Sequence, residues 1–145
     1  MDLFGSLLMC VPGPAAGFRE LVVAYGEVMD VRIKRVYDPP GDDGLRILVD
    51  RLWPRGLSKE RVHADRWLKE VAPSAGLRRW FGHDPDRWEE FKKRYGDELE
   101  GQPALSLLLD LAKKEKVTLL FSAKDVEHNH ARALLEFLLA NKHYE

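Results

Sequence analysis

The chain has 145 residues, which is the usual size of one domain with a single hydrophobic core. An apolar fraction of 45%, with 23 basic and 24 acidic residues, excludes a disordered or collagen-like chain. A net charge of -1 gives no overall attraction to nucleic acid, so any basic site must be local.

Cysteine content and hydropathy favour a cytoplasmic protein. The single cysteine, Cys10, cannot form an internal disulfide or a cysteine-rich zinc site, which indicates a reducing compartment. The apolar stretch from Leu3 to Val11 is too short to cross a bilayer and lacks the basic start of a signal peptide. We therefore expect no membrane partner.

Residues 1–28 differ in composition from the rest of the chain, because they are rich in small residues and carry little charge. We interpret them as an N-terminal extension, with Met29 as an alternative start of the protein. The other interpretation is an additional strand or helix, with residues 21–25 as its core-facing part. Residues 29–145 are predicted to form the domain itself.

Three later segments have the composition of β-strands. Residues 31–37 alternate well enough for a strand, and the turn-rich residues 38–44 follow them. Residues 45–50 and 117–121 are mostly apolar, which is typical of central strands buried on both faces.

Helical segments with recognisable starts lie between the second and third of these strands. Ser58 and Ser74 are suited to cap two of them, and Asp84, followed by a proline, begins a longer one. One buried face of the longer helix is predicted at Trp88, Phe91, Tyr95 and Leu99. Two more helices are predicted around residues 105–112 and 131–138.

The alternation of strands and helices predicts the fold class. Strands separated by helices pair in parallel through crossover connections. We therefore predict an α/β fold with a small, mainly parallel sheet and helices on both faces.

The segment Asp50–Gly56, directly after the second strand, is the first candidate site. In open parallel sheets, ligands bind beyond the carboxyl ends of the strands. The planar guanidinium groups of Arg51 and Arg55 could each donate two parallel hydrogen bonds to a phosphate or a carboxylate. The competing interpretation is that Asp50 pairs with one of these arginines and that Trp53 fills the core.

Residues 122–130 occupy the equivalent place after the third strand. Backbone N–H groups at a helix start favour an anion, and Lys124, His128 and His130 could add donors or protons. For Asp125 a helix cap is the favoured interpretation. A metal site is not expected, because two histidines two positions apart do not share a helix face.

Aromatic and basic side chains interleave between residues 53 and 88, and such residues could stack on nucleic-acid bases. Acidic residues neutralise the stretch, and the tryptophan spacing matches helix faces that pack inward, so core positions are favoured. His83 beside Asp84 could be an oriented acid or base, and a capped turn explains the pair equally well.

Several of these segments together resemble the YeaO-like family, domain of unknown function 488, over essentially all of residues 30–140. The segments that carry the resemblance are residues 33–37, 50–56, 67–73, 80–85 and 123–130. The resemblance implies a small cytosolic α/β domain of prokaryotes and brings no established activity with it. Longer relatives carry Cys-His-Arg near the position of Asn129-His130-Ala131, so thiolate catalysis is not expected in this sequence.

The leading functional hypothesis is a small-anion site for a phosphate or carboxylate, in a ligand-binding protein, a hydrolase or a group-transfer enzyme. Its anion-binding residues would be Arg51, Arg55 and Lys124, and its candidate catalytic residues Asp50, Asp125, His128 and His130. The alternatives are a nucleic-acid-binding module, which the net charge disfavours, and a protein-interaction domain without catalysis. No cofactor is expected, and the sequence does not define an oligomeric state.

Overall fold

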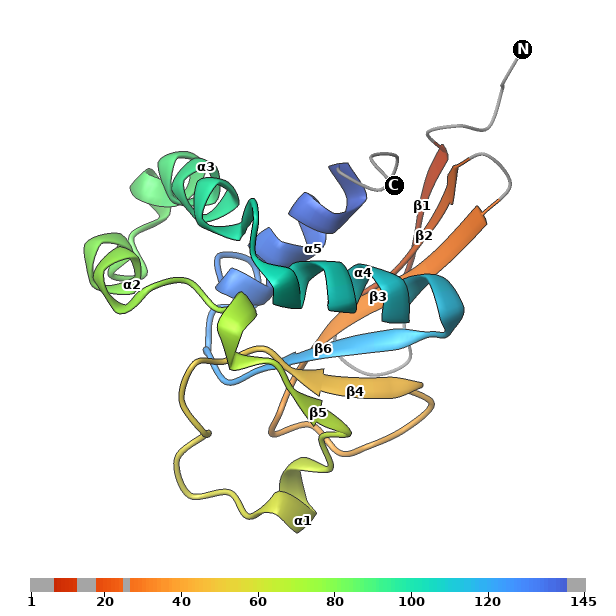
Figure 1. The fold of residues 1–145 in the computed structure, drawn as a ribbon. Coiled ribbons are helices and arrows are strands. Elements are labelled where there is room, and N and C mark those ends of the chain that lie inside the picture. The colour runs from red at the N-terminus through yellow and green to blue at the C-terminus, as the bar shows by residue number, and fades with distance from the viewer. Residues whose placement is uncertain (1–6, 13–17, 25–26, 141–145) are drawn as a thin grey trace.

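The computed structural model describes residues 7–12, 18–24 and 27–140, with side chains from Met29 onward. The strands in these residues form one sheet in the order β1-β2-β3-β6-β4-β5 (Figure 1). They are β1 (Leu7–Pro12), β2 (Phe18–Ala24), β3 (Glu27–Arg35), β4 (Leu45–Leu48), β5 (Arg66–Trp67) and β6 (Val117–Phe121). Strands β3, β6, β4 and β5 pair in parallel, whereas β1, β2 and β3 pair antiparallel. The predicted α/β class is confirmed.

The segment interpreted as an extension contributes strands β1 and β2. Strand β2 pairs with β3 from Arg19 opposite Arg32 to Ala24 opposite Glu27, so the backbone continues the sheet beyond β3. This matches the interpretation of this segment as additional secondary structure. The boundary of the domain at residue 29 stays a prediction.

The helices are distributed unequally over the two faces of the sheet (Figure 1). They are α1 (Lys59–Val62), α2 (Ala75–Phe81), α3 (Trp88–Leu99), α4 (Pro103–Lys114) and α5 (His130–Ala140), with 3-10 turns at Lys69–Val71 and Pro85–Arg87. The main core lies between α2–α5 and the sheet face that carries Val31, Ile47 and Leu119. The opposite face has a smaller cluster around Leu48, Val62 and Leu120, covered by the one-turn α1 and its neighbouring loops.

The helix starts follow from local side-chain chemistry. Ser58 accepts a hydrogen bond from Arg61 N–H, and Ser74 accepts one from Leu77 N–H, so both predicted caps are confirmed. Asp84 caps the 3-10 turn that precedes α3 rather than α3 itself. All four residues predicted for the inner face of α3 are buried.

A buried charge cluster lies on the opposite face of the sheet. Asp43, in the turn after β3, forms ion pairs with Arg32 (3.4 Å), Lys34 (3.1 Å) and Arg46, and all four side chains are almost fully buried. Arg46 also donates to the backbone oxygens of Val62 (2.8 Å) and His63, at the end of α1. The cluster therefore joins β3, β4, the 38–44 turn and α1.

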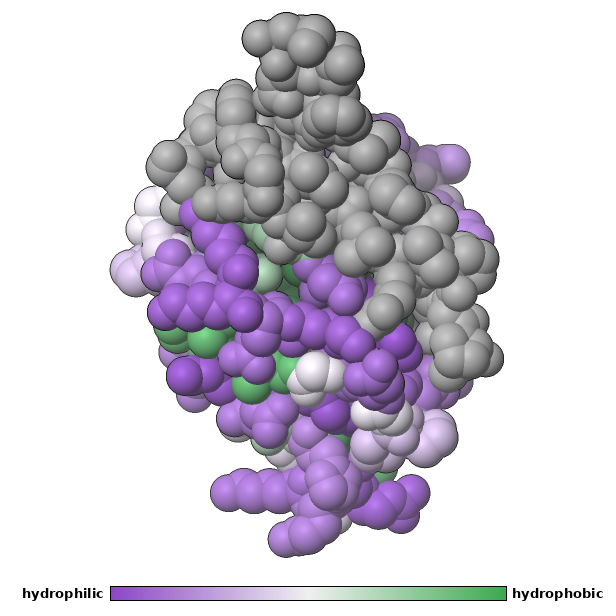
Figure 2. Space-filling view, turned by 90° about the vertical axis from the view of Figure 1, so that its right-hand side faces the viewer, coloured by the Kyte–Doolittle hydropathy of each residue, from purple (hydrophilic) through white to green (hydrophobic). Residues whose placement is uncertain are grey.

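The surface near the N-terminal strands is predominantly hydrophilic where Figure 2 shows described residues, with small separate apolar spots. Within the described part of the chain, no helix is long and apolar enough to span a membrane.

Candidate functional site

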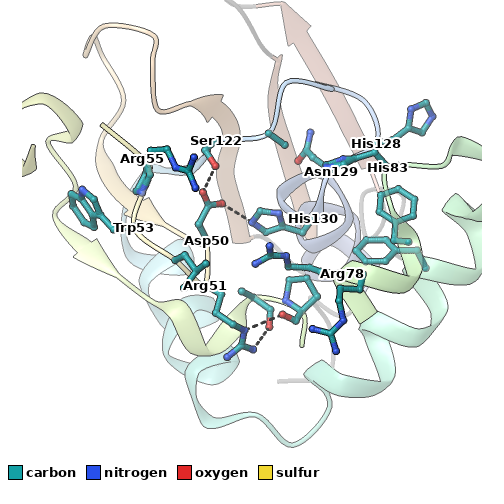
Figure 3. Close-up of a pocket in the computed structure, with 18 residues that line it drawn as sticks. Asp50, Arg51, Trp53, Arg55, Arg78, His83, Ser122, His128, Asn129 and His130 are labelled. Carbon is teal, nitrogen blue, oxygen red and sulfur yellow. Dashed lines mark hydrogen bonds and ion pairs between the residues drawn. The ribbon is translucent and has the colours of Figure 1, made fainter. Parts of the chain in front are cut away.

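A cleft of about 420 Å³ opens at the carboxyl end of β4 and β6 (Figure 3). Because these two strands are direct parallel neighbours, the segments that follow them begin side by side. Residues 50–55 form one wall and residues 122, 123 and 128–130 form another. The two segments that the sequence singled out therefore line one cavity.

Asp50 joins these two walls. Its Oδ2 accepts a hydrogen bond from Ser122 Oγ at 2.6 Å, and its Oδ1 lies 2.9 Å from His130 Nε2 (Figure 3). The carboxylate is buried, and its partners are Ser122 and His130 rather than one of the arginines. Oδ2 is therefore hydrogen-bonded to the protein, whereas Oδ1 and His130 Nε2 are buried at ion-pair distance without a hydrogen bond.

The two arginines that follow β4 are used differently. Arg51 donates from Nε to Pro73 O at 3.1 Å and from Nη2 to Ala72 O at 3.0 Å, so its guanidinium fixes the loop before α2. Arg55 is exposed, lines the cleft, and forms no ion pair with any residue whose side chain the structure describes. Of the two, Arg55 offers the more accessible donors to a ligand.

Helix α2 supplies a third wall that sequence reasoning did not assign to the site. Phe81 packs on Phe91 of α3, with ring centroids 4.4 Å apart, and this anchors the helix to the core. Arg78 and Arg79 lie on its exposed side and line the cleft, followed by His83. The only signal in the sequence was the amphipathic pattern of α2, which turns these arginines away from the core.

Asp125 holds the turn before α5 and does not cap the helix as predicted, because α5 begins only at His130; it also lies outside the cleft lining. Its Oδ1 accepts from the N–H groups of Glu127 (2.9 Å) and His128 (3.0 Å), and its Oδ2 lies 3.1 Å from His128 Nδ1. Burial alone would raise the pKa of Asp125, but these hydrogen bonds and the charge of His128 outweigh it and lower the pKa below its ordinary value. Lys124 is exposed and also lies outside the lining.

Asn129, which sequence reasoning missed, caps α5. Its side-chain oxygen accepts from Arg132 N–H at 2.8 Å, and its amide nitrogen donates to Asp125 O at 2.9 Å. The residue is buried, so the cap holds His128 and His130 on either side of it at the cleft. An Asx residue three positions before Arg132 was the available signal.

The charge of the cleft is strongly positive for a chain with a net charge of -1. Its lining contains one carboxylate, that of Asp50, against four arginines and three histidines: Arg51, Arg55, Arg78, Arg79, His83, His128 and His130. Among the described residues, no group of histidine, cysteine and acidic side chains is arranged to hold a metal ion. Ser122 Oγ donates to a carboxylate and not to a histidine base, so it lacks the activation of a nucleophilic serine.

Comparisons with known proteins identify the family of this chain. Residues 30–145 match the family described as "Inactive DUF488-N3 subclade". The chain is 45% identical to the uncharacterized protein YeaO of Escherichia coli over 112 residues, which are 76% of this chain and 97% of that protein. It is 43% identical to the uncharacterized protein Rv3073c of Mycobacterium tuberculosis over 109 residues, 74% of this chain and 92% of that protein. No solved structure matches the chain. The chain therefore belongs to the YeaO-like DUF488 family.

Proposed function

We propose that this domain binds small phosphate- or carboxylate-bearing molecules in the cleft and does not transform them. The observation that carries the proposal is the charge of the lining, where four arginines face one buried carboxylate that the protein already engages. Guanidinium groups suit phosphate and carboxylate because they donate two parallel hydrogen bonds. The word "inactive" in the description of the subclade also favours binding without catalysis.

The residues have different roles in this proposal. Arg55, Arg78 and Arg79 contact the anion, because they are exposed in the cleft and form no ion pair with other described side chains. Arg51 is a positioning residue, since its donors hold the loop at Ala72 and Pro73. Asp50 orients His130 toward the same space. Lys124 and Asp125 have no contact with the ligand.

A nucleic-acid module fits these observations less well. Two of the aromatic side chains between residues 53 and 88, Phe81 and Trp88, are buried in the core and cannot stack on bases. Trp80 is covered by two guanidinium groups, those of Arg87 at 5.2 Å and Arg94 at 4.2 Å from its ring centroid. These cations already use the ring face that a base would need.

The test is calorimetric titration of the full-length protein with inorganic phosphate and pyrophosphate. Replacing both Arg78 and Arg79 with alanine should weaken binding at least about tenfold, since each charged hydrogen bond contributes roughly 1.5–3 kcal/mol. Arg61→Ala is the matched control, because Arg61 is an exposed arginine of α1 outside the cleft. Equal weakening in the control, or no binding by the unmodified protein, would reject the proposal.

A further inference from the structure

A second cavity of about 380 Å³ lies next to the cleft, at the carboxyl ends of β3 and β6 and beside α5. His128 lines both cavities. Each cavity has the volume of a small-molecule site, for which about 300–1,000 Å³ is typical. The sheet edge therefore offers two adjoining compartments that meet at one histidine.

The second cavity differs from the cleft in its chemistry. Its apolar walls come from four side chains: Ile33, Trp88, Phe121 and Val126. Three basic and three acidic residues complete it, so it has no excess charge: Lys34, Arg35, Arg132, Asp38, Glu127 and Glu136.

Several of these charged groups are already engaged by other parts of the protein. Lys34 pairs with Asp43, and Arg35 donates to Ala123 O at 2.9 Å. Arg132 lies 3.4 Å from Glu136. The cavity consequently suits an uncharged group with an apolar face and a polar rim, rather than a second anion.

His128 has a fixed position between the two compartments. Its Nδ1 lies 3.1 Å from Asp125 Oδ2, and its ring centroid lies 5.3 Å from that of Trp88, with an angle of 82° between the planes. With one ring nitrogen held by Asp125, the other ring nitrogen remains to contact a ligand at the junction.

We propose that the two cavities bind one ligand, a phosphomonoester joined to a flat, uncharged ring, of which a nucleoside monophosphate is the common form. This rests on the proposed function, because the phosphate occupies the arginine-lined cleft. The ring occupies the neutral cavity, where Val126 is the exposed apolar side chain, and the linking sugar passes His128. Apolar contact with the ring supplies affinity that the phosphate alone lacks.

The experiment compares inorganic phosphate, ribose 5-phosphate, AMP and adenosine in equilibrium titrations with the full-length protein. AMP should bind about tenfold or more tightly than ribose 5-phosphate, because moving the ring from water into the cavity buries apolar surface. Val126→Trp fills the second cavity from a position that is 51% exposed, so it should remove this advantage and leave ribose 5-phosphate binding unchanged. The matched control is Leu107→Trp on α4, at a residue that is 38% exposed and outside both cavities.

The outcomes separate the two proposals. Equal binding of AMP and ribose 5-phosphate, or an AMP advantage that survives Val126→Trp, would overturn the shared ligand while phosphate binding leaves the proposed function in place. Failure of phosphate and ribose 5-phosphate to bind would contradict the proposed function itself. In an amide-shift experiment, AMP should move the signals of Val126 and Glu127 beyond the change that ribose 5-phosphate causes.

Discussion

Asp43 is the single carboxylate of the buried charge cluster formed with Arg32, Lys34 and Arg46. Its side chain is 1% exposed and holds three cations that are themselves almost fully buried. Removing the charge of one member of a buried ion network leaves uncompensated charges, which costs about 3–5 kcal/mol. Asp43→Asn should reduce the free energy of unfolding by an amount in this range, measured by urea denaturation. In the control, Asp42→Asn, the loss should be far smaller, because Asp42 is 89% exposed in its pair with Lys116.

The same residue predicts an acid-sensitive stability. Burial acts to raise the pKa of Asp43, but hydrogen bonds from Gly41 N–H, Lys34 and Arg46 outweigh it and lower the pKa below 3.8. The ionised carboxylate therefore contributes stability that is present above pH 3.8 and is lost as the pH falls through the lowered value. The unmodified protein should lose stability in this acid range more steeply than Asp43→Asn; parallel curves would show that Asp43 does not control it.

Trp88 is one of the aromatic side chains that connect α3 to the rest of the core. It is 8% exposed and packs on Phe81 and Phe91, with ring centroids 5.9 and 5.8 Å away. Trp88→Ala should cost about 3–5 kcal/mol in chemical denaturation, as large aromatic truncations do. Trp67→Ala should cost less, because Trp67 is 38% exposed. A loss below about 1 kcal/mol for Trp88→Ala would contradict its core position.

At the scale of elements, hydrophobic periodicity was informative where an element is long. It predicted α3 and α4, because their apolar residues recur with the helix period. The fully buried β6 was predicted from its continuous apolar run. Periodicity missed β5, since a two-residue strand has no period. It also could not show that Arg32 and Lys34 are buried, because their carboxylate partner lies in a turn whose path depends on tertiary structure.

The contribution of strands β1 and β2 to folding can be tested directly by removing them. We propose that residues 29–145 fold without them, since the family match begins at residue 30. A protein lacking residues 1–28 should therefore unfold in one cooperative thermal transition. A broad transition, or none, would show that the N-terminal strands are an integral part of the sheet.

At the scale of the whole molecule, the order of the strands in the sheet brings the residues of the site together. The positions of residues 50–56 and 122–130 after two buried strands predicted that they share one end of the sheet. The sequence could not show that β4 and β6 are direct neighbours, which brings Asp50 to Ser122 and His130. Nor could it place α2 over the same cleft, because that depends on the packing of Phe81 against Phe91.

The most direct test of the account is a titration of the isotope-labelled protein with sulfate, followed by backbone amide shifts. If the cleft binds anions, the amides of residues 51–55, 78–83 and 128–130 should shift together along one saturable curve, because one ligand contacts all three walls. Amides at α1, on the opposite face of the sheet, should not follow that curve. Shifts confined to one wall, or no saturable shift at millimolar sulfate, would contradict a shared anion site.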